Sequence, residues 1–245
     1  MTYCVGLNLR DGLVLLSDTR TNAGPDSIAT FGKLHVVAPE DRVIAMMTSG
    51  NLAVTQAVVA RVTEGAGIAG DEPFETLMTV KSMSDAARLV GDAVRKVYQT
   101  NAPSFAAQSL AFDASIILAG QIAGRRMRMF YIYSAGNYIE SAPETPFFQI
   151  GETKYGKPIL DRVARYDTPL EDAVKLALIS MDSTLRSNFS VGLPADLLVY
   201  RKDTQRVAVQ QRIGEDDPYY QQIRHEWSES LRKAYRDLPT PPWMA

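Results

Sequence analysis

Hydrophobic residues alternate with small or polar residues over residues 3–9, which is typical of a β-strand that buries one face. An Asp-Gly pair at 11–12 follows, a two-residue turn sequence that favours positive φ. Residues 13–17 then form the return strand of a predicted hairpin. A second strand pair is predicted over residues 33–37 and 42–47, with a polar turn between them.

The hydrophobic period becomes helical directly after the second strand pair. Apolar residues at helical spacing begin at Leu52, after the polar segment 48–51. A second helix is expected to start near Ser82 or Ser84, since either residue suits an N-cap, and to end at 101–103. Two consecutive helices are therefore predicted to follow four strands.

A similar order returns in the second half of the chain. It predicts two strands, over residues 115–119 and 127–133, and then two helices, one over residues 155–166 and one that begins at residue 168. A last hairpin over residues 196–200 and 206–210 and a charged, weakly amphipathic tail over residues 219–236 follow. Each sheet needs one face on the other sheet and each helix pair needs a sheet to cover, so we expect an α+β fold, a four-layer αββα sandwich. A doubly wound parallel fold would alternate single strands and helices. Residues 1–212 would form this domain, and residues 213–245 a C-terminal helical extension with a proline-rich tail, not a separate domain.

The composition excludes several classes of function. With 245 residues, 46% of them hydrophobic, the chain can bury a core and is not disordered. Its 26 basic and 28 acidic residues are scattered and give a net charge of -2, so neither a nucleic-acid partner nor a membrane partner is indicated. The single cysteine, Cys4, cannot form an intrachain disulfide, and no Cys or His spacing is typical of zinc. No export signal or membrane-spanning stretch is visible, so a cytoplasmic location is expected.

Thr2 combines two groups that could hydrolyse an amide. It follows a methionine and is small, so removal of that methionine is expected. Removal would leave one residue with a hydroxyl nucleophile and a free α-amine, whose reference pKa of about 7.7 to 8.0 suits a general base at neutral pH. The plain alternative is that Met-Thr is simply a common start.

Asp18 and Lys33 are candidates to assist Thr2. A lysine near the Thr2 amine would disfavour the protonated amine, and Asp18 would keep that lysine charged and oriented. An ideal two-residue hairpin, however, places Asp18 opposite Val5 and on the other face from Thr2, so a bulge or bend is required. Otherwise Asp18, Arg20 and Lys33 would form a surface salt-bridge cluster at a strand end.

Taken together, these residues resemble a known family. The matching residues of the chain are Thr2, Asp18-Thr19-Arg20, Lys33-Leu34-His35 and Ser49-Gly50. Their order and spacing resemble those of the proteasome β-subunit group of N-terminal nucleophile (Ntn) hydrolases, and the resemblance covers about residues 2–210. The Met-Thr-Tyr-Cys-Val-Gly start and the tail beyond Gln210 are most similar to the bacterial ancestral β-subunit type, Anbu.

The resemblance implies the four-layer fold and a catalytic arrangement. In it Thr2 is the nucleophile, Asp18 and Lys33 assist it, and the backbone amide of Gly50 donates to the oxyanion. Gly50 suits that role because a residue without Cβ lets a donor approach the developing charge closely. The plain alternative for Gly50 is an ordinary turn glycine.

The resemblance also extends to the later part of the chain. Asp182 and Ser183 look like the family's aspartate and nearby serine that support the terminal threonine. Glu152 stands where the family has a serine in a Gly-Ser segment, and this is a departure. A carboxylate there would raise the pKa of the Thr2 amine and so oppose Lys33.

The expected function is that of a proteasome-like threonine peptidase subunit. It would hydrolyse a peptide or unfolded protein as part of a homo-oligomer of ring or ring-like form, with no cofactor or metal. An Ntn amidohydrolase acting on small amides stays open, as does a weak or inactive structural ring subunit, which Glu152 and a retained Met1 favour. Whether an unfoldase partner delivers the substrate is open as well.

Overall fold

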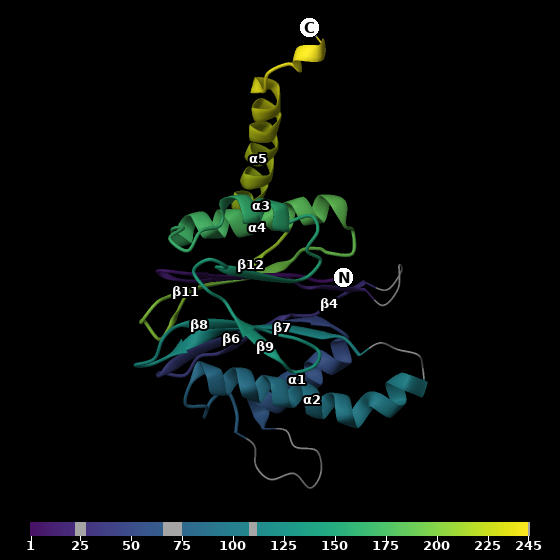
Figure 1. The fold of residues 1–245 in the computed structure, drawn as a ribbon, viewed down its shortest axis with the longest axis vertical. Coiled ribbons are helices and arrows are strands. Elements are labelled where there is room, and N and C mark those ends of the chain that lie inside the picture. The colour runs from purple at the N-terminus through teal and green to yellow at the C-terminus, as the bar shows by residue number, and fades with distance from the viewer. Residues whose placement is uncertain (23–27, 66–74, 108–111, 245) are drawn as a thin grey trace.

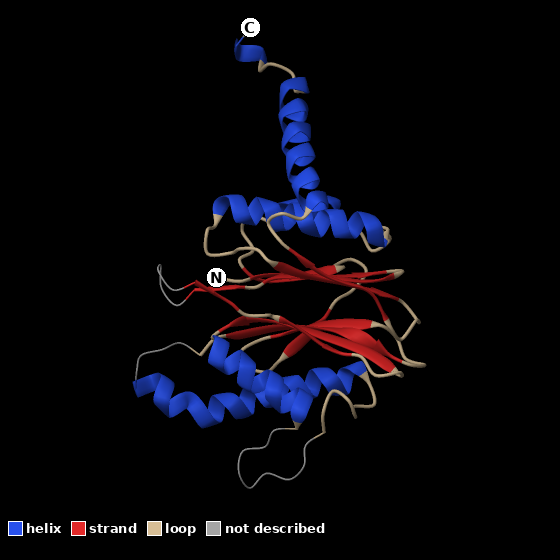
Figure 2. Ribbon diagram, turned by 180° about the vertical axis from the view of Figure 1, so that it is seen from behind, coloured by secondary structure: helices blue, strands red, loops and turns tan. Residues whose placement is uncertain are grey.

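A computed structural model describes residues 1–22, 28–65, 75–107 and 112–244 of the chain. The described residues form four layers, in which two stacked sheets lie between two pairs of helices (Figure 1, Figure 2). Every strand pairing is antiparallel. The predicted αββα sandwich is therefore confirmed.

The first sheet holds the N-terminal strand at its second position. Its strand order is β10-β1-β2-β11-β12, with β1 (Tyr3–Leu9), β2 (Gly12–Asp18), β10 (Phe147–Gly151), β11 (Ala195–Arg201) and β12 (Val207–Ile213). The helices α3 (Lys157–Val163) and α4 (Leu170–Ser187) cover its outer face. Because both faces of β1 and β2 are covered, almost every residue of these two strands is buried.

The second sheet carries the other helix pair. Its strand order is β5-β6-β7-β8-β9, with β5 (Leu34–Val37), β6 (Arg42–Gly50), β7 (Ala114–Ile122), β8 (Arg128–Ile132) and β9 (Tyr138–Glu140). The helices α1 (Leu52–Glu64) and α2 (Met83–Ala107) pack on its outer face. The Asn51 side chain caps α1 by accepting from the Val54 amide, so β6 passes into α1 within one residue.

A third apolar core fills the space between the sheets. Residues from both sheets, among them Cys4, Leu15, Met47 and Ile117, are almost completely buried there. A separate two-stranded sheet, β3 (Arg20–Asn22) with β4 (Ile28–Thr30), follows β2 and was not predicted. The layers fix the positions of the strand ends, including the end of β6 at Gly50.

The hairpin register differs from the expected one. Leu9 pairs with Gly12, so the turn consists of residues 10–11 and Gly12 already belongs to β2. The pairing of Cys4 with Ser17 then brings Asp18 beside Tyr3 rather than opposite Val5. The turn is two residues long as expected, but it lies one residue earlier, and this shift moves the register by two positions without a bulge.

The helix boundaries also differ in two places. Ser82 caps α2 by accepting from the Asp85 amide, but α2 continues past Asn101 and Pro103. Phe105 beyond the proline packs edge-on against Phe112, a tertiary contact that favours the longer helix. The helix expected over 155–166 is the shorter α3.

The C-terminal extension forms one long helix. The helix α5 (Pro218–Asp237) begins with Asp217 capping the Tyr220 amide, and a single 3-10 turn, η1 (Pro242–Met244), follows it. Only Tyr220 and Ile223 of α5 are buried, in the core of the first sheet. The rest of α5 projects away from the sandwich (Figure 1). Within the described part of the chain, no helix has the length and apolarity that crossing a membrane requires.

Candidate active site

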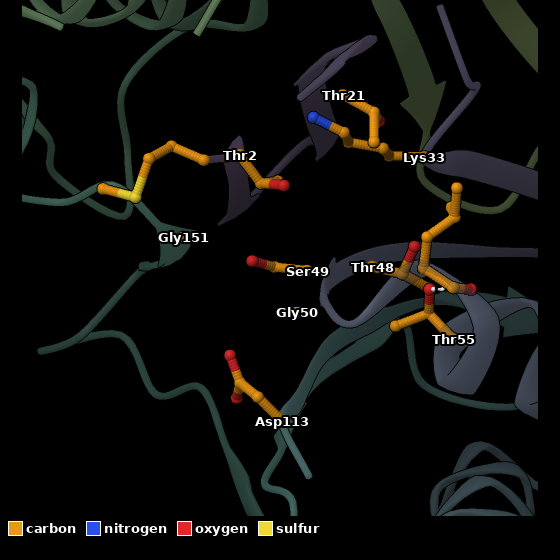
Figure 3. Close-up of a pocket in the computed structure, with 11 residues that line it drawn as sticks. Thr2, Thr21, Lys33, Thr48, Ser49, Gly50, Thr55, Asp113 and Gly151 are labelled. Carbon is orange, nitrogen blue, oxygen red and sulfur yellow. Dashed lines mark hydrogen bonds between the residues drawn. The ribbon is translucent and has the colours of Figure 1, made fainter. Parts of the chain in front are cut away.

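A cavity of about 320 Å³ opens where β1 begins and β6 ends. Thr2, Lys33 and Gly50 line it, together with Met1 and Ser49, which the sequence also drew attention to, and with Thr21, Thr48, Leu52, Thr55, Asp113 and Gly151. Figure 3 shows the side chains of Thr2 and Lys33 directed toward the same open space, with Ser49 and Asp113 on its other side. Six separate segments of the chain thus meet at one site.

Asp18 and Lys33 form a buried ion pair next to the cavity. The Lys33 Nζ lies 2.6 Å from the Asp18 Oδ1 and also donates to the Arg20 carbonyl at 2.7 Å. Asp18 Oδ1 accepts from the Tyr3 amide at 2.8 Å, which ties the pair to the residue after Thr2. Burial raises the pKa of the Asp18 carboxyl, and the Lys33 ammonium opposes that shift. The pair therefore holds the lysine amine in a fixed direction.

Thr2 directly precedes β1, and a backbone hydrogen bond holds it in place. Its carbonyl accepts from the Glu152 amide at 2.6 Å, and Thr2 is 9% exposed. Gly151 has a φ of 81°, and a Cβ there would lie 2.1 Å from the Thr2 oxygen. Gly151 must therefore be glycine, because both its conformation and the close approach of Thr2 exclude a side chain.

The backbone amide of Gly50 points past the end of β5. The Thr48 amide donates to the Lys33 carbonyl, and amide directions alternate along a strand, so the Gly50 amide faces the same side. β5 begins only at Leu34, so no strand residue covers that amide on this side. Gly50 has a φ of 117°, and a Cβ on it would lie 2.3 Å from the Asp113 carbonyl oxygen. Only glycine fits this junction.

The amino-terminal amine lies in the same electrostatic environment. With Met1 in place, the pKa of the α-amine is lowered by burial first and by Lys33 second, while Asp18 opposes the shift. Met1 is 58% exposed, so its side chain does not anchor it in the core. A lowered pKa leaves more of the amine neutral at a given pH, which is the form that accepts a proton.

The structure places Asp182 and Ser183 away from this cavity. Asp182 is 1% exposed and its carboxylate binds Arg186 and Arg224, and the Ser183 hydroxyl donates to the Ile179 carbonyl within α4. Neither residue lines the cavity. They project from α4 toward its own turns and α5, so they do not join Thr2, Asp18, Lys33 and Gly50.

The Glu152 carboxylate binds groups other than the amine, in contrast to the expectation from the sequence. One carboxylate oxygen accepts from the Lys154 amide and the other from the Asn188 side chain, each at 2.9 Å. Glu152 is not among the groups that shift the pKa of the α-amine. Its contribution is instead structural, because it ties the segment after β10 to the end of α4.

Several lining residues could not be found from the sequence. Asp113 reaches the site only because β7 pairs with β6, and its carbonyl accepts from the Asn51 amide at 2.9 Å. Gly151 had one available signal, a glycine at the end of a predicted strand. Among the described residues, no group of three or more His, Cys, Asp or Glu side chains is placed to hold a metal ion.

Comparisons with known proteins identify the family of the chain. Residues 2–193 match the model of the proteasome subunit family. No protein with curated annotation matches the chain.

Solved structures of Anbu proteins are similar over nearly the whole chain. A Gly-1 mutant of Anbu from Hyphomicrobium sp. strain MC1 is 48% identical, covering 98% of this chain and 99% of that one, with a TM-score of 0.90. Anbu, the ancestral β-subunit, from Yersinia bercovieri is 47% identical over 98% of both chains, with a TM-score of 0.89. The helical assembly of the Anbu complex from Pseudomonas aeruginosa is 45% identical over 98% of both chains, also with a TM-score of 0.89. The chain belongs to the proteasome subunit family and is similar to its Anbu members.

Proposed function

We propose that the protein is a threonine-type peptidase that uses Thr2 as its amino-terminal nucleophile. One observation supports this most directly: a buried Asp18–Lys33 pair adjoins a cavity that both Thr2 and Gly50 line. A hydroxyl, a cation and an oxyanion donor at one opening are the groups that acyl transfer requires. The chemistry needs Thr2 to become the terminal residue.

The mechanism divides amide hydrolysis into two steps. The Thr2 hydroxyl attacks the substrate carbonyl while its own α-amine accepts the hydroxyl proton, directly or through one water, and the Gly50 amide stabilises the oxyanion. Collapse of the tetrahedral intermediate passes that proton to the leaving amine and forms an ester with Thr2. Water then hydrolyses the ester and restores the hydroxyl. Lys33 keeps the amine neutral through its charge, and Asp18 orients Lys33.

An inactive, structural subunit is the alternative, and it depends on whether the protein keeps Met1. A chain that keeps Met1 has no α-amine on Thr2, so the proposed base is missing. Intact-mass measurement of the purified protein separates the two possibilities. A population without Met1 is expected to react, and a population that retains it is expected to be inert.

The decisive experiment uses a threonine-directed electrophile, such as a peptide vinyl sulfone, followed by peptide mapping. We expect one adduct per chain, located on Thr2, and no adduct in the Thr2→Ala variant. Hydrolysis of fluorogenic peptides and of small amides is measured in parallel, so that an amidohydrolase restricted to small substrates would be recognised. An adduct on any other residue would overturn the assignment.

We further propose that the active form is a homo-oligomer. The relative from Pseudomonas aeruginosa is described as a helical assembly, and the sequence alone suggested a ring or ring-like form. Electron microscopy of the purified protein distinguishes an open helical arrangement from a closed ring. A monomer in analytical ultracentrifugation at micromolar concentration would contradict self-assembly.

A further inference from the structure

We propose that Asp113 makes the cavity selective for substrates with a basic side chain immediately before the cleaved bond. This inference rests on the proposed function, because it names the class of peptide that the Thr2 site accepts. It follows from the charges that line the cavity and from the place of Asp113 among them.

Asp113 supplies the one acidic side chain of the lining. Lys33, the other charged side chain of the lining, is neutralised by Asp18 at 2.6 Å. Glu152 adjoins the cavity wall at Gly151, but its two oxygens are bound by the Lys154 amide and Asn188. When the α-amine is neutral, as the proposed mechanism requires, a substrate side chain in this space meets a net negative charge from the described side chains.

Within the described part of the chain, the Asp113 carboxylate is available to bind a cation. Asp113 is exposed, and the one described side chain in contact with its Oδ1 is Ser134, whose hydroxyl lies at the marginal distance of 3.5 Å. That hydroxyl is already engaged, since it donates to the Ala114 carbonyl at 2.9 Å. Figure 3 shows the carboxylate extending into the space beside Ser49 and Gly50.

The backbone of Asp113 fixes its distance from the reacting carbonyl. The Asp113 carbonyl accepts from the Asn51 amide, and it lies so close to Gly50 that a Cβ there would be 2.3 Å away. The Asp113 backbone is thus adjacent to Gly50, whose amide would bind the oxyanion, and both residues line the cavity. A basic side chain on the substrate residue whose carbonyl Thr2 attacks can therefore reach the Asp113 carboxylate.

The rest of the lining suits a polar side chain. Thr21, Thr48, Ser49 and Thr55 contribute hydroxyl groups, whereas Leu52 and Met1 are the apolar members. Removal of Met1 takes away one of these two. Such a mixed wall accommodates both the aliphatic stem and the polar head of arginine or lysine.

The test compares fluorogenic peptides that differ only in the residue before the cleaved bond: arginine, citrulline, norleucine and glutamate. Citrulline keeps the shape of arginine and removes its charge. We expect kcat/KM for arginine to exceed that for citrulline by about tenfold, as for a charge-assisted hydrogen bond in a partly exposed site. Asp113→Asn should abolish this ratio while the citrulline rate changes less than about twofold, and Asp113→Lys should favour glutamate.

Asp167→Asn is the matched control, because Asp167 is an exposed aspartate in the α3–α4 connection outside the cavity. It should retain the full preference for arginine. Equal rates for arginine and citrulline in the unmodified protein, or an Asp113→Asn effect that is the same for both, would overturn the inference while leaving Thr2 catalysis intact. Failure of the electrophile to label Thr2 would instead overturn the proposed function and the inference together.

Discussion

Two buried carboxylates, Asp18 and Asp182, have cationic partners but lie in different surroundings. Asp18 is 0% exposed and pairs with Lys33, whose side chain is only 6% exposed. Asp182 is 1% exposed, yet its partners Arg186 and Arg224 have side chains that are 51% and 37% exposed. The first pair is enclosed on both sides, whereas the second places a buried acid under two hydrated cations.

This difference assigns the two acids to different roles. Lys33 lines the cavity beside Thr2, so the proposed mechanism has the Asp18–Lys33 pair act on the reacting groups. Arg186 belongs to α4 and Arg224 to α5, so Asp182 joins these two helices. Asp182 also faces the Tyr220 hydroxyl at 3.5 Å, and burial raises the pKa of that tyrosine. A buried acid with a basic partner is therefore not evidence of catalysis unless the partner reaches a cavity.

The largest expected effect is that of Lys33→Met. Methionine fills a similar volume but has no charge. The α-amine, whose pKa Lys33 lowers when Met1 is present, would therefore lose that neighbour, and in the proposed mechanism so would the amine of Thr2. We expect Thr2 labelling and peptide hydrolysis to fall about 10³-fold, the range of a lost contribution to proton transfer. Lys202→Met, at an exposed turn position, is the control. A Lys33→Met variant with more than a tenth of the normal rate would remove Lys33 from the mechanism.

Asp18→Asn should have the largest effect on stability. It leaves the Lys33 ammonium buried without a carboxylate, and breaking such a pair costs about 3 kcal/mol or more. Urea unfolding followed by circular dichroism measures the change. A loss below about 1 kcal/mol would mean that Lys33 finds water on unpairing, and the pair would then resemble that of Asp182.

Asp182→Asn is the matched variant for the second carboxylate. Arg186 and Arg224 are already partly hydrated, so we expect a loss of only about 1 kcal/mol in the free energy of unfolding. The start of α5 should become more accessible to proteases, while the rate of Thr2 labelling stays within about twofold. A large loss of labelling with an unchanged fold would return Asp182 to the catalytic group.

The sequence predicted the layers better than the local details. The switches between period-two and helical patterns identify both sheets and their helix pairs, because each pattern reports which face is buried. The hairpin register was wrong because residues 10–12 allow two turns, and the choice depends on how β2 packs against β11. The β3–β4 sheet was missed because two strands of three residues show too little alternation to be recognised.

The candidate site was predicted in part for a similar physical reason. Thr2, Asp18, Lys33 and Gly50 lie near strand ends that the pattern already located. Asp113 and Gly151 enter through strand pairings with β6 and β1, contacts that no local pattern encodes. Asp182 and Ser183 were assigned by resemblance. They do not line the cavity, and the sequence could not reveal this because it does not show which side of α4 faces the sheet.

The smallest expected effect concerns the α-amine and connects the chemistry to pH. Burial and Lys33 lower its pKa below the ordinary value of 8.0, so the neutral amine persists to lower pH than in an unfolded chain. Limited acylation of the Met1-containing protein at a series of pH values, read by peptide mass, should therefore show a midpoint below 8.0. Lys33→Gln should move the midpoint upward, because it removes a lowering charge and leaves the opposing Asp18 unpaired; Lys202→Gln should not. An unchanged midpoint in Lys33→Gln would show that Lys33 does not act on the amine, and the contrast between the two carboxylates would then lose its chemical basis.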